Sequence, residues 1–591
     1  MSLKRSCFVS FANKSRKLIA IVIILCLFAP LTLAGSSASF TPQFTTLRIG
    51  LFYGPSALPS ANLQNAEGFG SGFDFGFFDN NRNFVPIGAW TSETRITIAI
   101  DRNMVWHPTA AEGRGEFREG TQGNIVLGAF HVMLKPGFST FEEARTEASR
   151  HQGGFVRYQA GSQSPFFVMV GQHTTRAAAE TAMANLGISG AEVCSGTSNT
   201  ITVVRTGTNN IIFEFEAGTT ALGVMPRPIG SENPETWFRG FRYHGGFAYS
   251  RRDGGFLTVI NMVDIEDYVK GILPYEMSNT WPMEALKAQA LTARTFAIRS
   301  IGRHGSEGFD LCVEVHCQVY RGRGLANDRT DSAVDETRGM FITFNGRPAE
   351  TVYASSNGGA SESSENVWVE ARPYLRGVVD PWEADVARRI PGYNWSVSHT
   401  PAQLSARIRE RFPTSNLGTI TAVRVTERSP SGNVIGVTLT DSNGRTFTLS
   451  GRAQINRGLG TPTLRFDIVG GATWSPGGVL ANQPAQAAGQ GGQVSVIDGA
   501  GNVTVRPAGE LHAITGTGDV VNVAGGGATG GTGGGTGLVD GRFTFNGAGS
   551  GHQVGMSQWG AFSMAQYHNL TFRDIIHFYF TGVEITEMYG R

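Results

Sequence analysis

Cysteine and charge are both scarce in this chain. Only five of its 591 residues are cysteines, and 16% of the residues are charged. Cys7 and Cys26 fall in the N-terminal leader, which leaves Cys194, Cys312 and Cys317; three thiols cannot all pair internally, and this excludes a disulfide scaffold. The 49 lysines and arginines balance 48 acidic residues, and a formal charge of +1 gives no global field that would attract nucleic acid. No nucleic-acid partner is expected.

Glycine, in contrast, is abundant. The 78 glycines, together with the low charge, predict turn-rich β structure and flexible linkers rather than long exposed helices. A length of 591 residues exceeds that of one typical domain and predicts two or three folded units. The fold class that we expect is α+β and rich in strands.

The N-terminus has the pattern of an export signal. Five basic residues between positions 4 and 17 precede an apolar run over residues 18–33, and the small residues Thr32 and Ala34 suit cleavage after Ala34. An uncleaved signal anchor is the alternative, because the run is only slightly short of a membrane span. Both interpretations place the rest of the chain outside the cytoplasmic membrane, in the cell wall or at the outer face of that membrane.

Residues 126–205 contain an internal repeat. Each copy reads as a strand, a helix and a strand: 129–134, 141–149 and 155–158 in the first copy, then 166–171, 176–186 and 190–194 in the second. Two such copies predict a small βαββαβ sandwich of the split βαβ kind. Farther along, residues 470–541 are dominated by Gly, Ala and Gln, a composition typical of a flexible insertion.

These signals divide the chain into six segments. They are a signal peptide at 1–34, the first part of a core at 45–120, the repeat unit as an insert at 121–205, the main core at 206–470, the glycine-rich flexible insertion at 471–541 and the last part of the core at 542–591.

The helical segment 264–300 offers the clearest candidate for chemistry. A short helix is expected to end at Pro274, and a second helix to begin near Pro282 with an alanine-lined inward face. Glu276 lies between the two, next to Tyr275 and Met277, where an apolar setting would raise its carboxyl pKa and suit it to act as a general acid.

Two basic residues on the second helix bear on this interpretation. Lys287 and Arg294 are seven residues apart on one helical face and could both reach toward Glu276. The alternative is that Glu276 only caps the second helix or pairs with Lys287.

Three distal blocks combine glycine with polar and aromatic side chains, as loops that approach a sugar closely do. They read CVEVHCQVYRG at 312–322, VYASSNGGAS at 352–361 and GHQVGMSQWGA at 551–561. The candidates for hydrogen bonding to and stacking on saccharide are Gln318, Tyr320, Ser355, Ser356, Asn357, His552, Gln558 and Trp559. For Tyr320 and Trp559 the alternative is a place in the hydrophobic core.

A possible metal site lies in the first of these blocks. Two thiolates and one or two imidazoles can form a tetrahedral zinc site, and His304, Cys312 and Cys317 are the expected ligands, with His316 left open. A disulfide between Cys312 and Cys317 is the alternative outside the cell.

The runs YVKGILPYEM at 268–277 and EALKAQALTARTFA at 284–297 resemble the signature of the SpoIID/LytB family. The resemblance implies a discontinuous SpoIID-like core, a catalytic role for Glu276 with Lys287 as helper, structural zinc as in some members, and lytic transglycosylase activity on peptidoglycan glycan, denuded in the sporulation members. The 121–205 unit resembles SPOR domains, which bind glycan stripped of stem peptides.

The same resemblance leaves other functions open. The LytB branch implies a non-catalytic wall-binding protein that enhances a cell-wall amidase, which would then be a partner. A muramidase is a third possibility, and it would require a second carboxylate such as Asp380, Glu383 or Asp385 near Glu276. A sporulation role and a vegetative role both remain open.

Overall fold

The computed structural model describes residues 41–109, 115–231, 233–469 and 537–587, with the backbone of four short strands between 493 and 522. The expected signal peptide, and the greater part of the expected glycine-rich insertion, lie outside the described residues. In the part of the chain that is described, no helix has both the length and the apolar character needed to cross a membrane.

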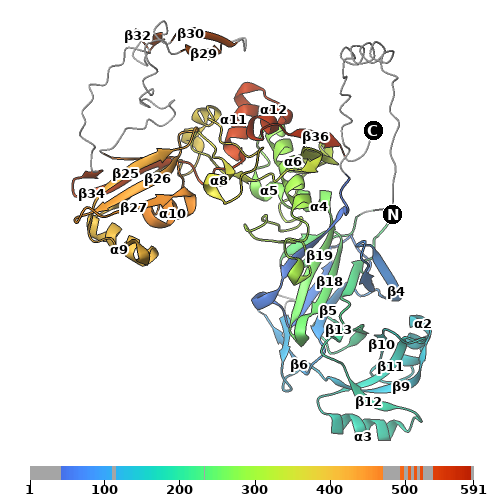
Figure 1. Cartoon of the computed structure of the whole chain (residues 1–591). Helices are drawn as coiled ribbons and strands as arrows, with labels where there is room; N and C mark the ends of the chain where they lie inside the picture. Colours follow the sequence, from blue (N-terminus) through green and yellow to red (C-terminus); the bar gives the residue numbers. More distant parts are fainter. Residues whose placement is uncertain are drawn as a thin grey trace, which may run out of the picture.

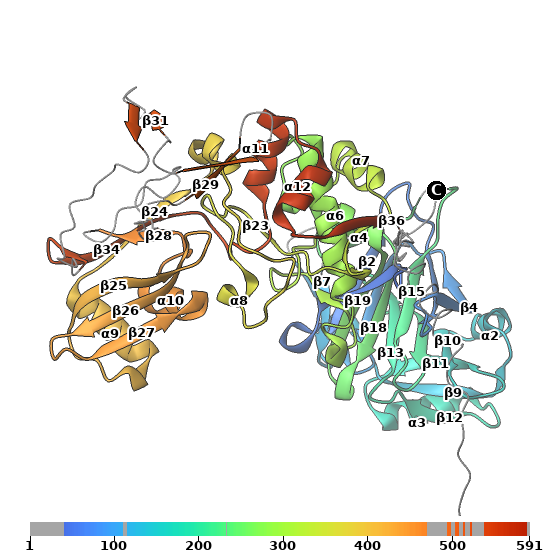
Figure 2. The same cartoon turned by 45° about the horizontal axis from the view of Figure 1, so that its top comes forward.

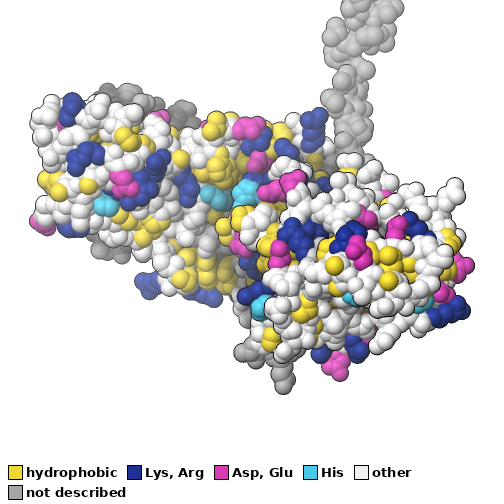
Figure 3. Space-filling view, turned by 90° about the horizontal axis from the view of Figure 1, so that it is seen from below, with side chains coloured by type: hydrophobic (Ala, Val, Ile, Leu, Met, Phe, Trp, Pro, Cys, Tyr) yellow, Lys and Arg dark blue, Asp and Glu magenta, His cyan; other side chains and the backbone are white. Residues whose placement is uncertain are grey.

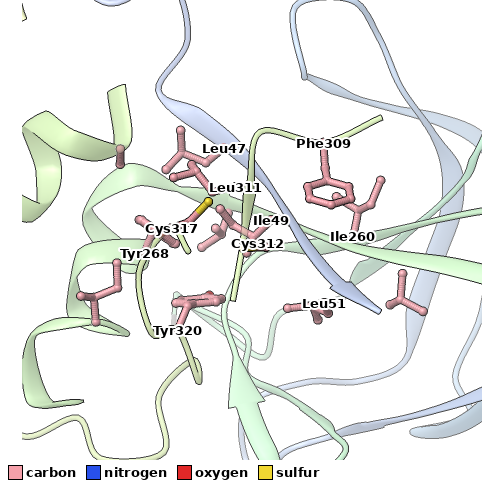
Figure 4. Packing of buried hydrophobic residues seen from close by; sticks show 14 of the residues in the cluster. Leu47, Ile49, Leu51, Ile260, Tyr268, Phe309, Leu311, Cys312, Cys317 and Tyr320 are labelled. Atoms are coloured by element: carbon pink, nitrogen blue, oxygen red, sulfur yellow. The ribbon is translucent and has the colours of Figure 1, made fainter. Parts of the chain in front are cut away.

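A seven-stranded sheet forms one layer of the N-terminal half (Figure 1). Its strand order is β20 (Leu311–Cys312), β1 (Thr46–Phe52), β19 (Leu257–Asp264), β18 (Gly246–Arg251), β15 (Leu222–Pro226), β3 (Phe73–Phe78) and β4 (Phe84–Thr91). Alternate residues of β1, which are Leu47, Ile49 and Leu51, point into the core as period-two alternation requires. Figure 4 shows them packed beside Cys312 and Tyr320.

A ten-stranded sheet forms the second layer. Its order is β12 (Glu192–Ser195), β9 (Phe130–Phe138), β11 (Phe166–His173), β10 (Gly154–Gln159), β14 (Ile211–Glu216), β13 (Ile201–Arg205), β5 (Arg95–Ile100), β2 (Ser60–Asn65), β16 (Thr236–Phe238) and β17 (Phe241–Tyr243). A smaller sheet of β6 (Met104–Pro108), β7 (Gly115–Glu119) and β8 (Val126–Leu127) lies against it, with β7 contacting β2.

The predicted βαββαβ unit is confirmed as a topology. Helices α2 (Phe141–Ala148) and α3 (Arg176–Leu186) connect β9 to β10 and β11 to β12, and the strand order is β12, β9, β11, β10. The unit shares the ten-stranded sheet with the core, because β10 pairs in parallel with β14. It forms the lower right end of the molecule in Figure 1.

A buried helix joins the sheets to the C-terminal region. Helix α6 (Met283–Arg299) begins directly after Pro282 as predicted, and nearly all of its side chains are buried. Helix α4 (Ile265–Lys270), α7 (Asp328–Glu336), α11 (Gln558–His568) and α12 (Phe572–Tyr579) pack around it. Pro274 does not end the preceding helix: it lies in the first turn of a separate short helix, α5 (Leu273–Glu276), of which Glu276 is the last residue.

A third body lies beyond these helices, at the left of Figures 1 and 2. Strands β25 (Ile420–Arg428), β26 (Val434–Asp441) and β27 (Thr446–Ser450) form a sheet that contacts α9 (Pro401–Arg411) and α10 (Gly451–Leu459). Strands β24 (Asn394–His399), β34 (Arg542–Ala548) and β28 (Phe466–Ile468) form another.

The C-terminal segment returns to the core. Strand β35 (Met556–Ser557) pairs with β23 (Tyr353–Ala354), and β36 (Glu584–Glu587) pairs with β21 (Met340–Phe344). Residues that are more than 200 positions apart in the sequence are therefore brought side by side next to α6. Over the face shown in Figure 3, basic and acidic side chains are interspersed, in keeping with the near-zero net charge.

Candidate active site

Glu276 is the last residue of α5 and is half-buried. The Nε2 group of Gln558 donates a hydrogen bond to Glu276 Oε2 over 3.1 Å. The hydroxyl of Tyr353 and the backbone N–H of Val319 donate to the same carboxyl group. Burial raises the pKa of Glu276, and these three hydrogen bonds act in the opposite direction by stabilising the charged form.

Two further amide side chains hold this arrangement in place. Gln318 Nε2 donates to the Tyr353 hydroxyl over 3.0 Å, which leaves the hydroxyl proton for Glu276. Gln289, fully buried on α6, accepts from Gln558 Nε2 over 3.5 Å. Glu276 therefore sits in a polar network supplied by α5, α6, the 318–319 segment, β23 and the first residue of α11.

Lys287 and Arg294 do not take part in this network. Lys287 Nζ lies 2.9 Å from Glu284 and 2.7 Å from Glu336, so it joins α6 to α7. The expectation that Arg294 reaches toward Glu276 is wrong. Its guanidinium is fully buried and forms a two-point ion pair with Glu266 of α4, with nitrogen–oxygen distances of 2.6 and 3.1 Å.

The predicted saccharide-binding residues divide into those near the surface and those in the core. Gln318 and Gln558 are buried and belong to the Glu276 network. Ser355 is exposed, and its carbonyl accepts from the Trp559 N–H over 3.1 Å. The Trp559 ring is half-buried and lies 4.8 Å from that of Trp281.

His552 is a partly buried residue in the same region. Burial, with the positive charge of Arg452, lowers its pKa to about 4, so its ring is neutral near pH 7. The His552 ring lies 5.1 Å from that of Trp368, whose side chain is 39% exposed. A neutral imidazole beside an exposed indole can hydrogen-bond and stack, but it cannot supply a positive charge.

Tyr320 is a core residue, contrary to the expectation that it stacks on saccharide. Its side chain is 1% exposed, its ring packs 4.9 Å from that of Tyr268, and its hydroxyl donates to Asn261 Oδ1 over 2.8 Å. Tyr320 therefore anchors the segment that presents Gln318 and Val319, and it does not face solvent.

Ser356 and Asn357 are also buried, and they bind acidic side chains. Ser356 Oγ donates to Glu383 over 2.8 Å, and Asn357 Nδ2 donates to Asp380 over 2.8 Å. The Ser557 hydroxyl also donates to Glu383, so this carboxylate ties the 352–361 and 551–561 blocks together. Ser356 and Asn357 therefore shape these loops and do not contact a ligand directly.

Four possible metal ligands converge in the 304–317 segment. The ligand atoms of His304, Cys312, His316 and Cys317 all lie within 4.8 Å of one another. The sulfur–nitrogen distances are 3.5, 3.7 and 3.8 Å, and both cysteines are free thiols. A hydrogen bond with Cys317 lowers the pKa of Cys312 to about 4. The structure thus brings His316 to the three ligands that were expected.

Sequence reasoning missed Tyr353, Gln289 and Trp281. Tyr353 lies inside the VYASSNGGAS block that was singled out, two residues before the first of the serines that were chosen. Gln289 could have been identified from the sequence, since it is a polar residue among the small and apolar residues of the inward helical face.

Comparison with known proteins places part of the candidate site inside a segment shared with a known family. Residues 253–344, which include Glu276, Lys287 and the four possible metal ligands, match the family model described as Stage II sporulation protein. This match, together with similarity to proteins named amidase enhancer and Stage II sporulation protein D, supports the resemblance to the SpoIID/LytB family. The SPOR-like character of the 121–205 unit finds no such support.

Proteins similar to this chain include an uncharacterized protein of Brachyspira hyodysenteriae, 29% identical over 62% of this chain and 78% of the relative. The amidase enhancer of Bacillus subtilis is 26% identical over 54% of this chain and 40% of its own length. Stage II sporulation protein D of Bacillus subtilis is 28% identical over 35% of this chain and 61% of its own length. This chain thus aligns with less than two thirds of the two Bacillus proteins.

Proposed function

We propose that this protein is an exported lytic transglycosylase that cleaves the bond between N-acetylmuramic acid and N-acetylglucosamine in peptidoglycan, with Glu276 as the acid and base. The observation that carries the proposal is the Glu276 carboxyl group itself. The residue is half-buried, burial raises the pKa of its carboxyl group, and three donors surround that group. These are the properties that a group needs in order to release a proton and later take one back.

The proposed reaction uses one carboxyl group in two steps. Glu276 first gives its proton to the departing N-acetylglucosamine oxygen as the glycosidic bond breaks. The muramic acid C6 hydroxyl then attacks C1, and its proton passes to Glu276, which closes a 1,6-anhydro ring and restores the acid. Gln558, Tyr353 and the Val319 N–H stabilise the carboxylate between the two steps.

The surroundings of the other carboxylates support this chemistry over a muramidase. A muramidase needs a second carboxylate near the acid. Asp380 and Glu383 are almost fully buried and hold loop groups, and Asp385 binds His568 over 2.7 Å. Among the described residues, these three candidate partners are therefore already engaged.

Ser355, His552, Gln558 and Trp559 are the residues that we propose to hold the glycan beside Glu276, and Lys287 is retained as a positioning residue that joins α6 to α7. The 121–205 unit is proposed as a SPOR-like module for denuded glycan. A non-catalytic amidase enhancer, with a wall amidase as partner, is the alternative function, and one relative carries that name.

Zinc fits the cluster formed by His304, Cys312, His316 and Cys317. Tetrahedral zinc with sulfur and nitrogen ligands separates those ligands by about 3.5 Å, close to the distances seen. His304 Nδ1 lies 2.7 Å from Glu307 Oε2, which leaves Nε2 for a metal, an orientation common in zinc sites. The ion would supply structural support, fixing the loop that carries Gln318 and Val319.

The test is the digestion of purified glycan, with and without stem peptides, by the unaltered chain and by Glu276→Gln. Product formation should fall on the order of 10²–10⁴-fold in the variant, with binding to sacculi retained. Glu410→Gln, at an exposed glutamate on α9, is the matched control and should keep full activity. Undiminished anhydro products from Glu276→Gln would refute the assignment, and unchanged glycan with every protein would favour the amidase enhancer.

A further inference from the structure

A cavity of about 520 Å³ lies on the ten-stranded sheet, where β2, β5 and β16 meet the β7 strand. None of the residues that bind Glu276 lines it. The Asn62 amide holds one wall in place by donating to the Gly115 carbonyl over 2.7 Å. The cavity is therefore a feature separate from the candidate active site.

A row of three side chains forms the floor of this cavity. Trp237 of β16 is directly opposite Gln64 of β2, and Gln64 is directly opposite Arg95 of β5. Residues opposite each other on neighbouring strands project to the same face of a sheet. With strands about 4.8 Å apart, the row extends roughly 10 Å from the indole to the guanidinium.

The charge of the cavity favours an anion at one end. Arg95 is exposed and has no ion pair with a carboxylate among the described residues. The acid that lines the cavity, Glu116, lies 2.6 Å from Arg118 and 3.6 Å from Arg239, so its charge is already balanced. Arg95 therefore remains as an unbalanced positive charge at the end of the row.

At the other side of Gln64, Trp237 offers an aromatic surface, and the guanidinium of Arg242, directly opposite on β17, lies 5.7 Å from the centre of its ring. The Trp237 side chain is 39% exposed, although it belongs to a paired strand of a sheet. An exposed indole in a polar hollow can stack on the apolar face of a sugar ring, and the neighbouring amide can bind hydroxyl or acetamido groups. A guanidinium at the far end can bind a carboxylate through two hydrogen bonds.

We propose that this cavity is a second saccharide site, specific for a sugar that bears a carboxylate. Trp237 stacks on the ring, Gln64 hydrogen-bonds to it and Arg95 binds the carboxylate. The choice of N-acetylmuramic acid with a free lactyl group as that sugar rests on the proposed wall function.

In the experiment, the exported protein is titrated with N-acetylmuramic acid and, separately, with N-acetylglucosamine, which lacks the lactyl carboxylate. Ligand-observed NMR gives both dissociation constants. We expect the unaltered chain to bind N-acetylmuramic acid at least tenfold more tightly, because only that sugar offers a carboxylate for a charge-assisted hydrogen bond. Arg95→Gln should remove that preference, and Trp237→Ala should weaken binding of both sugars about tenfold.

Two matched controls keep the outcome clear. Arg411→Gln and Phe256→Ala change an exposed guanidinium and an exposed ring elsewhere and should bind as the unaltered chain does. Equal affinity of the unaltered chain for the two sugars would overturn the proposal. So would Trp237→Ala and Arg95→Gln variants that bind both sugars as the controls do. The proposal would also fail if inorganic phosphate displaced N-acetylmuramic acid and Trp237→Ala had no effect on binding. Neither sugar contains a glycosidic bond, so the result is independent of the proposed lytic activity.

Discussion

The possible metal cluster and the Glu276 network are neighbours that were assembled in opposite ways. The farthest pair of ligands, His304 and Cys317, is 13 positions apart, and one turn-rich segment brings all four together. The bond from Gln558 to Glu276 spans 282 positions and depends on β35 pairing with β23 and on α11 packing against α6. Local spacing is visible in a sequence, whereas the second arrangement requires the whole fold.

The largest effect on stability is expected for the ion pair that joins α6 to α4. Arg294→Met leaves Glu266 as a buried unpaired carboxylate, and this should lower the free energy of unfolding by about 3–5 kcal/mol. Urea titration followed by circular dichroism measures the change.

The double variant Glu266→Gln/Arg294→Met is the control for that prediction, because it removes both charges together. It should recover a large part of the lost stability. A single variant as stable as the unaltered chain would show that this ion pair does not hold α6 in place.

Gln558→Leu should reduce activity roughly 10–100-fold, because a hydrogen bond to a charged group contributes about 1.5–3 kcal/mol. The bond stabilises the carboxylate and so lowers the pKa of Glu276, and its removal should raise that pKa further. The acid must be protonated to act, so the high-pH limb of the rate profile should move to higher pH. A limb that moves to lower pH, or stays in place, would contradict the role given to Gln558.

Glu307→Gln should weaken zinc binding about 10–100-fold, because the carboxylate orients the His304 ring. Competition with a chromogenic chelator measures the affinity. Glu314→Gln, which removes an exposed carboxylate in the same segment, is the matched control and should leave zinc binding unchanged. A preparation without zinc and without free thiols at Cys312 and Cys317 would instead indicate a disulfide.

The smallest effect is expected for Tyr320→Phe. Loss of its hydrogen bond to Asn261 should lower the free energy of unfolding by about 1 kcal/mol, with no direct loss of glycan affinity. Trp559→Ala is the counterpart, and it should weaken glycan binding. Equal loss of glycan affinity in both variants would show that Tyr320 contributes directly to glycan binding.

Much of the local structure could be predicted. The alanine face of residues 284–297 indicated the buried helix that became α6, and the repeat between 126 and 205 indicated the βαββαβ order. Both patterns arise from side-chain periodicity within one element, which the chain carries in its own sequence. Glu276 was chosen from its place between two predicted helices and from the family resemblance, and three of the four possible metal ligands were chosen from the close spacing of His and Cys residues.

The errors arose where a contact partner is distant in sequence. Arg294 has the right spacing to follow Lys287 along α6, but its partner, Glu266, belongs to a different helix. Tyr320 lies in a glycine-rich polar block and still enters the core beside Tyr268. Composition describes the neighbours of a residue in the chain, and burial is decided by its neighbours in space.

The most direct test of the central claim is digestion of denuded glycan in water enriched in ¹⁸O, followed by mass spectrometry of the released saccharides. Attack by the C6 hydroxyl uses no water, so the account predicts muramic acid ends that lack the elements of water and carry no ¹⁸O. Reducing ends that contain ¹⁸O would show hydrolysis by a second catalytic group, and would contradict the assignment of both proton transfers to Glu276.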